Sequence, residues 1–167
     1  MTQPTLPPDV REVLFVCTGN SCRSVMAEYA FKKFAAEKKL DVRAHSAGIA
    51  AAHDLGPSPE TVQVLKADGI DARAHVSRMV YEHTIESADM VLALTEQHAE
   101  HLRRHFPDAE SKIYLLTEFY TGPEKAYFAQ GVPDPIGMTT VFYQNTYTVI
   151  RACVQNLADR LEAQTRA

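Results

Sequence analysis

The chain reads Val13-Leu14-Phe15-Val16-Cys17-Thr18-Gly19-Asn20-Ser21-Cys22-Arg23-Ser24 at the point that decides its fold. The apolar residues over 13–16 are typical of a strand buried on both faces of a parallel sheet. A polar loop of this length, between a strand and a helix, can direct successive backbone N–H groups at one tetrahedral oxyanion. We therefore expect a phosphate-binding loop after the first strand, formed by Thr18, Gly19, Asn20, Ser21, Cys22, Arg23 and Ser24.

Cys17 ends that strand, and its surroundings are those of a nucleophile. A thiolate is stabilised by a helix N-terminus and by a neighbouring guanidinium, and the sequence supplies both. Arg23 offers parallel N–H donors to phosphoryl oxygens and stabilises the charge of an in-line transition state. The hydroxyl of Ser24 can donate to the Cys17 sulfur and help it to leave in a second step.

The rest of the chain alternates strands with helices. We expect further strands over 42–46, 90–94 and 113–116, and helices over 24–39, 59–68, 81–87, 96–105 and 140–161. Ser58 and Thr95 are typical N-caps, Pro59 is typical of a first helical position, and Gly69 is typical of a helix end. The segment 117–137 is rich in glycine and proline, which indicates a loop.

Strands separated by helices predict an α/β fold. The expected architecture is a three-layer sandwich in which a four-stranded parallel sheet is flanked by helices on both faces. Ligands bind at the carboxyl ends of the strands in such sheets, and Cys17 stands at one of these ends. The predicted fold and the predicted chemistry therefore agree.

Length and composition indicate one globular domain without a nucleic-acid or membrane partner. The chain has 167 residues and a formal net charge of -4, with no basic run, and no stretch is apolar enough to span a membrane. The segment 1–8 lacks the features of a signal peptide, and three cysteines do not make a disulfide framework, so we expect a cytoplasmic protein. We expect a flexible segment over 1–10 and a single domain over 11–167, with a monomer favoured.

The phosphate-binding loop after the first strand, together with Asp134-Pro135 late in the chain, resembles the low-molecular-weight protein tyrosine phosphatase family. The resemblance spans nearly the whole chain and also includes Ser46-Ala47-Gly48, Gly56-Pro57-Ser58-Pro59, and His75 with Arg78. It implies hydrolysis of phosphorylated protein side chains through a phosphocysteine intermediate, with inorganic phosphate as product. We expect this chemistry to need no cofactor and no metal ion.

Asp134 is the predicted general acid, because the leaving group must be protonated and Asp134 lies in a proline-flanked loop. The same carboxylate would then activate water against the phosphocysteine. Asp54 and Glu118 are the alternatives, although solvated loop carboxylates are the simpler interpretation of both.

Several further side chains have candidate supporting roles. The resemblance implies that Asn20 fixes the loop through side-chain hydrogen bonds that reach Ser46, and His75 is expected to be a structural hydrogen-bonding residue. Cys22 is either a small buried residue or, as the resemblance suggests, a reversible disulfide partner that protects Cys17 from over-oxidation. Cys153 is expected in the core.

Three histidines recur at helical spacing, and we interpret them as a solvated helix face rather than a metal site. These residues are His98, His101 and His105.

Ser21 is the predicted determinant of substrate choice. Tyrosine-directed members of the family typically carry a bulky aliphatic residue at this position, and aromatic residues where this chain has Ala50-Ala51-Ala52 and Ile136-Gly137. The bacterial protein arginine phosphatase branch resembles the chain more closely, since it carries threonine at the Ser21 position. A small hydroxyl residue leaves space for a planar guanidinium and can hydrogen-bond to it.

Phosphoarginine is therefore the favoured substrate, with phosphotyrosine as the alternative. Two further alternatives are a thioredoxin-coupled arsenate reductase and a non-catalytic phosphate-binding or phosphocarrier module. The former needs additional cysteines, which the segment 77–104 lacks, and the latter has no need of a general acid.

Overall fold

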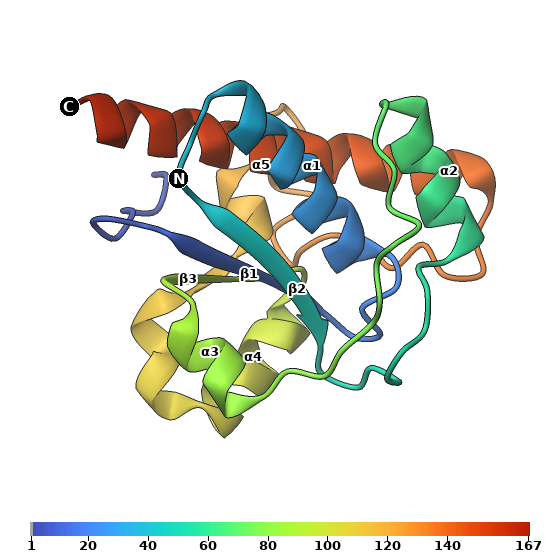
Figure 1. Ribbon diagram of the computed structural model, residues 1–167, viewed down its shortest axis with the longest axis horizontal. Helices are drawn as coiled ribbons and strands as arrows, with labels where there is room; N and C mark the ends of the chain where they lie inside the picture. The colour runs from blue at the N-terminus through green and yellow to red at the C-terminus, as the bar shows by residue number, and fades with distance from the viewer. Residues whose placement is uncertain (1) are drawn as a thin grey trace.

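A four-stranded parallel sheet forms the centre of the molecule, in a computed structural model that describes residues 2–167 (Figure 1). The spatial order is β2-β1-β3-β4, so the two central strands have neighbours on both sides. The strands are β1 (Glu12–Cys17), β2 (Arg43–Gly48), β3 (Met90–Ala93) and β4 (Ile113–Leu115). The predicted α/β fold with a parallel sheet is confirmed.

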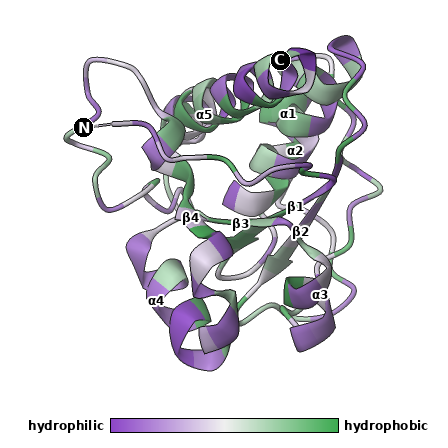
Figure 2. Ribbon diagram, turned by 90° about the vertical axis from the view of Figure 1, so that its left-hand side faces the viewer, coloured by the Kyte–Doolittle hydropathy of each residue, from purple (hydrophilic) through white to green (hydrophobic). Residues whose placement is uncertain are grey.

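Helices cover both faces of this sheet (Figure 2). One face carries α1 (Arg23–Glu37), α2 (Pro59–Ala67) and α5 (Thr140–Arg166), and the other carries α3 (Glu82–Ser87) and α4 (Glu96–His105). Two short 3₁₀ helices, η1 (Pro107–Lys112) and η2 (Leu116–Phe119), flank β4. The three layers follow from the alternation of strands and helices along the chain.

The apolar run over 13–16 is explained by the burial of β1 on both of its faces. Val13 and Phe15 belong to the core under α1 and α5, whereas Leu14 and Val16 belong to the core under α3 and α4. Successive side chains of a strand point to opposite faces, so a strand between two helical layers must be apolar at every position.

The helix ends lie close to those that the sequence predicts. Ser58 Oγ accepts a hydrogen bond from the Thr61 amide, Pro59 occupies the first turn of α2, and Gly69 adopts a left-handed φ of 74°. The last helix is longer than predicted, since it continues to Arg166 rather than ending at 161. Its extra turn includes an ion pair between Glu162 and Arg166, at 2.7 Å.

The N-terminal segment lies along α5. Arg160 donates to the Gln3 side chain and the Pro4 carbonyl, and Gln164 donates to the Pro7 carbonyl. The flexibility expected of the segment 1–10 stays a prediction, and Met1 lies outside the described residues. Within residues 2–167, none of the helices combines the length and the apolar character that crossing a membrane would require.

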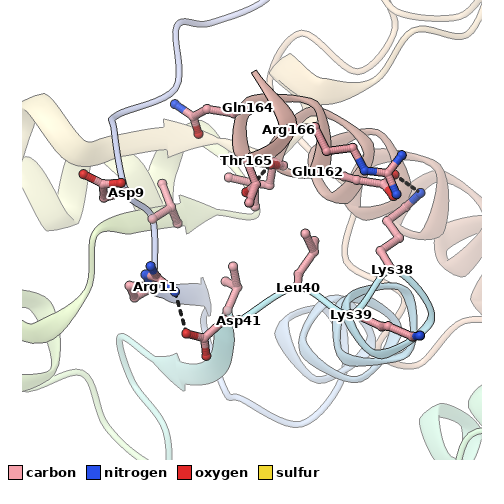
Figure 3. Close-up of a pocket in the computed structure, with 13 residues that line it drawn as sticks. Asp9, Arg11, Lys38, Lys39, Leu40, Asp41, Glu162, Gln164, Thr165 and Arg166 are labelled. Atoms are coloured by element: carbon pink, nitrogen blue, oxygen red, sulfur yellow. Dashed lines mark hydrogen bonds and ion pairs between the residues drawn. The ribbon is translucent and has the colours of Figure 1, made fainter.

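A mixed-charge cavity of about 430 Å³ opens at the amino end of β1, the end opposite to Cys17 (Figure 3). Arg11 and Asp41 pair across one side of it, and Glu162 pairs with Lys38 and Arg166 on another. The charges that line this cavity are thus largely engaged with one another, and it takes no part in the site at the other end of the sheet.

Asp68 connects three helices on the α1 face. It follows α2, accepts hydrogen bonds from Lys33 of α1 at 2.9 Å, and accepts from both Tyr147 and Arg151 of α5 at 2.5 and 2.9 Å. Burial would raise the pKa of this carboxyl group, but the three hydrogen bonds outweigh burial and lower the pKa to about 2. The ionised form therefore stabilises the packing of these helices.

Replacement of Asp68 by Asn is expected to lower the free energy of unfolding at pH 7 by about 2 kcal/mol. The carboxyl pKa is lower in the folded state than its ordinary value of 3.8, so its contribution is present above pH 3.8 and is lost as the pH falls toward 2. Denaturant unfolding at several pH values measures both effects. Asp41→Asn is the control, because the Asp41 side chain is 89% exposed and surface pairs contribute little. Equal effects of the two substitutions would contradict the role of Asp68.

Candidate active site

The predicted phosphate-binding loop joins the carboxyl end of β1 to the N-terminus of α1. Cys17 is buried, and its Sγ lies 2.9 Å from Ser24 Oγ. Cys22 occupies the N-cap position of α1 but makes no side-chain capping bond, so the first amides of the helix remain directed toward the loop. A buried thiol and the first amides of a helix therefore share this strand-to-helix junction.

Asn20 holds the loop from within. Its Nδ2 donates to Ser24 Oγ and Ser46 Oγ, each at 2.9 Å, and its Oδ1 accepts from the Arg78 amide at 3.0 Å. Because Ser24 Oγ accepts from Asn20, its own hydrogen is left for the Cys17 sulfur. Asn20 has a φ of 53°, a left-handed conformation that asparagine tolerates better than most residues.

The residues that follow β2 form backbone hydrogen bonds with the start of the phosphate-binding loop. The amides of Ile49 and Ala50 donate to the carbonyls of Cys17 and Thr18, both at 3.0 Å. A Cβ atom at Gly48 would lie 2.4 Å from the Thr18 carbonyl oxygen, so this close approach requires glycine.

His75 supports the loop from the other side, in the structural position expected for it. Its Nε2 lies 3.0 Å from the Asn20 carbonyl oxygen, and its Nδ1 lies 3.6 Å from a carboxylate oxygen of Glu28. Both side chains are buried. The conformation of the loop thus depends on residues from α1 and from the segment that precedes α3.

Arg23 and Asp134 are brought together although they are far apart in sequence. Arg23 Nη1 donates to the Val132 carbonyl at 3.0 Å, and its Nη2 lies 3.5 Å from Asp134 Oδ2. The guanidinium is buried, whereas the Asp134 side chain is 47% exposed. A carboxylate that is open to solvent thus lies beside the loop, as a general acid requires.

The segment before Asp134 is attached to the end of β3. The Val132 amide donates to the Leu94 carbonyl at 2.8 Å, and Gly131 pairs with Thr95 in an antiparallel bridge. Gly131 has a φ of 110°, and a Cβ atom there would lie 2.4 Å from the Leu94 carbonyl oxygen. This contact again requires glycine.

The two alternative acids lie in other settings. Glu118 Oε2 accepts from the Leu115 amide at 2.7 Å, which engages this carboxylate at the start of η2. Asp54 is an exposed loop residue, and among the described residues no hydrogen bond or ion pair connects its side chain to Cys17.

Cys22 is a buried free thiol beside hydroxyl groups. Its Sγ lies 3.3 Å from Ser58 Oγ and 3.7 Å from both Ser21 Oγ and Tyr143 Oη. Cys17 and Cys22 are both free, so their reversible disulfide stays a prediction. Cys153 is fully buried in the core, as expected, and burial raises the pKa of its thiol to about 12.

His98 corrects the interpretation of the three histidines as a solvated face. It is only 3% exposed, because the start of α4 packs against the phosphate-binding loop. Its Nε2 lies 2.8 Å from Thr18 Oγ1, and its Nδ1 accepts from the Thr95 amide at 3.1 Å. The spacing Thr95-x-x-His98, which resembles a capping box, is the sequence signal that could have indicated this arrangement.

His101 and His105 stack on each other with ring centroids 4.0 Å apart, and His105 is exposed. Across residues 2–167, no group of three or more His, Cys, Asp or Glu side chains is arranged to hold a metal ion.

A family model described as low molecular weight phosphotyrosine protein phosphatase matches residues 12–167. The chain therefore belongs to the low molecular weight phosphotyrosine protein phosphatase family. The match favours a phosphatase over the arsenate reductase and phosphocarrier alternatives.

Relatives within the family differ in the substrate that their names state. The chain is 36% identical to a protein-arginine-phosphatase of Bacillus subtilis (strain 168), over 93% of the chain and 99% of the relative. It is 39% identical to the low molecular weight protein-tyrosine-phosphatase YfkJ of the same organism, over 87% of the chain and 93% of the relative. A solved structure of the YwlE arginine phosphatase, a mutant with a phosphorylated active-site serine, superposes with a TM-score of 0.84 at 35% identity, covering 93% of this chain and 98% of that one.

The buried position of His98 predicts a specific pH dependence of stability. Burial and, to a smaller extent, the charge of Arg23 lower the pKa of His98 from 6.5 to about 4, against the opposing charge of Asp134. Since the unfolded state takes up a proton near pH 6.5 and the folded state near pH 4, stability is lost as the pH falls from 6.5 to 4, by up to about 3 kcal/mol.

His98→Asn is expected to reduce this loss, because the Asn carbonyl oxygen can replace Nδ1 as acceptor for the Thr95 amide but does not titrate. Denaturant unfolding at pH 7, 5.5 and 4.5 measures the slope. The exposed His105 provides the control as His105→Asn. An unchanged slope in the His98 variant would show that this ring is not buried in its neutral form.

Proposed function

We propose that this protein is a cysteine-dependent protein phosphatase that removes phosphoryl groups from phosphorylated side chains, with phosphoarginine as the preferred substrate residue. The observation that carries the proposal is the contact of Cys17 Sγ with Ser24 Oγ at 2.9 Å, at a strand-to-helix junction that also holds Arg23 beside Asp134. These groups supply a nucleophile, a partner for its sulfur, a cation for the phosphoryl group and an acid for the leaving group.

In the first step, the Cys17 thiolate attacks phosphorus and forms a sulfur–phosphorus bond. The bond from phosphorus to the leaving nitrogen or oxygen breaks, and Asp134 donates a proton to the leaving atom. Arg23 has five N–H donors, of which Val132 and Asp134 engage two, and the others are free to bind phosphoryl oxygens. The loop amides at the N-terminus of α1 bind the remaining charge.

In the second step, water attacks the phosphocysteine and Asp134 accepts its proton. The sulfur–phosphorus bond breaks, and inorganic phosphate is released. The hydroxyl of Ser24 stabilises the departing thiolate, because Asn20 leaves its hydrogen directed at Sγ. No step requires a cofactor or a metal ion.

The preference for phosphoarginine rests on the side chains around the loop. Ser21 is small and half-buried, and alanines follow Ile49 where tyrosine-directed members carry an aromatic residue. The arginine phosphatase relative supports this assignment. Phosphotyrosine is the second candidate, because the 39% identical relative is named a protein-tyrosine-phosphatase.

We infer further that the enzyme acts in the cytoplasm, as a monomer with one domain over 11–167. The free thiols favour a reducing compartment, and the two apolar clusters pack against opposite faces of one sheet.

The mechanism is tested with two aryl phosphates, phenyl phosphate and the better leaving group p-nitrophenyl phosphate. We expect Cys17→Ser to abolish turnover of both, and Asp134→Asn to lower kcat for phenyl phosphate by at least about 100-fold, with a smaller loss for p-nitrophenyl phosphate. Asp54→Asn is the matched carboxylate control and keeps wild-type rates. Full activity of the Cys17 variant, or an equal loss on both substrates in the Asp134 variant, would contradict the roles proposed.

Substrate choice is tested by the ratio of kcat/KM for a phosphoarginine peptide to that for a phosphotyrosine peptide. The ratio is expected to exceed one in the wild type and to fall by about tenfold or more in Ser21→Ile, because the aliphatic side chain removes both space and hydroxyl. Ser21→Thr keeps the hydroxyl and should retain the preference. Turnover of phosphotyrosine alone by the wild type would overturn the assignment, and an unchanged ratio in Ser21→Ile would refute the role of Ser21.

A further inference from the structure

The hydroxyl of Thr18 stands directly after the nucleophile and is held by a residue from a different layer. Thr18 is exposed, and its Oγ1 lies 2.8 Å from Nε2 of the buried His98 on α4. Among the residues that the structure describes, His98 is the one hydrogen-bond partner of this hydroxyl. The direction of the Thr18 hydrogen therefore depends on which ring nitrogen of His98 carries a proton.

The surroundings of His98 fix that proton on Nε2. The Thr95 amide donates to Nδ1 at 3.1 Å, and Thr95 Oγ1 lies 3.0 Å from the same nitrogen. A backbone amide can only donate, so Nδ1 must present its lone pair. In a neutral ring the other nitrogen then carries the hydrogen.

The ring is kept neutral by its environment. Burial lowers the pKa of His98, and the nearby charge of Arg23 on α1 lowers it further, as does His101 on α4, against the opposing charge of Asp134 in the 131–136 segment. Protonation of Nδ1 would also direct its new N–H at the N–H of the Thr95 amide, and two donors repel each other. The arrangement of hydrogens therefore persists at neutral pH.

Nε2 consequently donates to Thr18 Oγ1, and the hydrogen of Thr18 is left for another acceptor. The exposed position of Thr18 leaves that hydrogen accessible to a ligand in the loop. A hydroxyl that accepts one hydrogen bond becomes a better donor in the next, and a charged acceptor strengthens such a bond further. A phosphoryl oxygen of a substrate on Cys17 is an acceptor of this kind.

We propose that Thr18 donates a hydrogen bond to the substrate phosphoryl group, and that His98 is the positioning residue that directs this hydroxyl. The proposal rests on the phosphatase function proposed above and deepens it by adding one side-chain donor to the backbone amides of the loop. His98 acts through Thr18 and does not itself contact the substrate.

Substitutions at both positions test the coupling. Thr18→Val is expected to lower kcat/KM for p-nitrophenyl phosphate by about tenfold or more and to weaken binding of inorganic phosphate similarly, whereas Thr18→Ser restores both. His98→Asn keeps an acceptor for the Thr95 amide but has no atom at the Nε2 position, so it should show the same losses. The double variant Thr18→Val/His98→Asn should lose no more activity or phosphate binding than Thr18→Val alone.

The control is His101→Asn, on the same helix, which is expected to leave both measurements unchanged. Additive losses in the double variant, or unchanged phosphate binding in Thr18→Val, would overturn the proposal. If His98→Asn does not fold, ¹⁵N NMR of the wild-type histidines decides the matter, because a hydrogen found on Nδ1 of His98 contradicts the proposed direction and one found on Nε2 supports it.

Phosphate binding by calorimetry separates this inference from the proposed function. A wild type that hydrolyses neither phosphopeptide nor aryl phosphate would refute the phosphatase function. In that case, loss of phosphate binding in Thr18→Val and His98→Asn would still support the donor role of Thr18, and its retention would refute it.

Discussion

The three hydrogen bonds of the Asn20 side chain are the interaction on which the site depends. They join the loop after β1 to Ser46 of β2 and to the Arg78 amide, and they determine which way the Ser24 hydroxyl donates. A buried amide group with unmet hydrogen-bonding capacity is costly, so the loop has one well-satisfied conformation rather than several. The left-handed backbone at Asn20 is stable because these bonds fix it.

Segments far apart in the sequence meet at the carboxyl ends of the strands. Two glycines make this possible, since Gly48 lets the loop approach β2 and Gly131 lets the segment that carries Asp134 approach the end of β3. The buried apolar strands between the helical layers provide a rigid base for these contacts. The site therefore depends on the close approach of these backbone segments as well as on the side chains that they carry.

Local patterns were sufficient to predict most of the fold. The apolar run of β1, the Ser58-Pro59 start of α2 and the Thr95 cap each depend on neighbours in sequence, and each is found as predicted. His98 was misinterpreted because its helix is strongly polar, and its burial arises from packing against a loop 80 residues away. The contact of Arg23 with Val132 spans 109 residues, and no local pattern specifies it. Long-range contacts, which decide where a loop lies, were thus the part that sequence patterns could not supply.

The attachment of Gly131 and Val132 to the end of β3 also sets a limit on motion. Asp134 follows Val132 by two residues, and two residues of fully extended chain span at most about 7 Å. Because Val132 is hydrogen-bonded to Leu94, only this short piece of chain separates the Asp134 carboxylate from a fixed point. The end of β3 therefore sets where the Asp134 carboxylate lies beside Arg23, and the reach of that carboxylate is limited to this short piece of chain and to rotation of its own side chain.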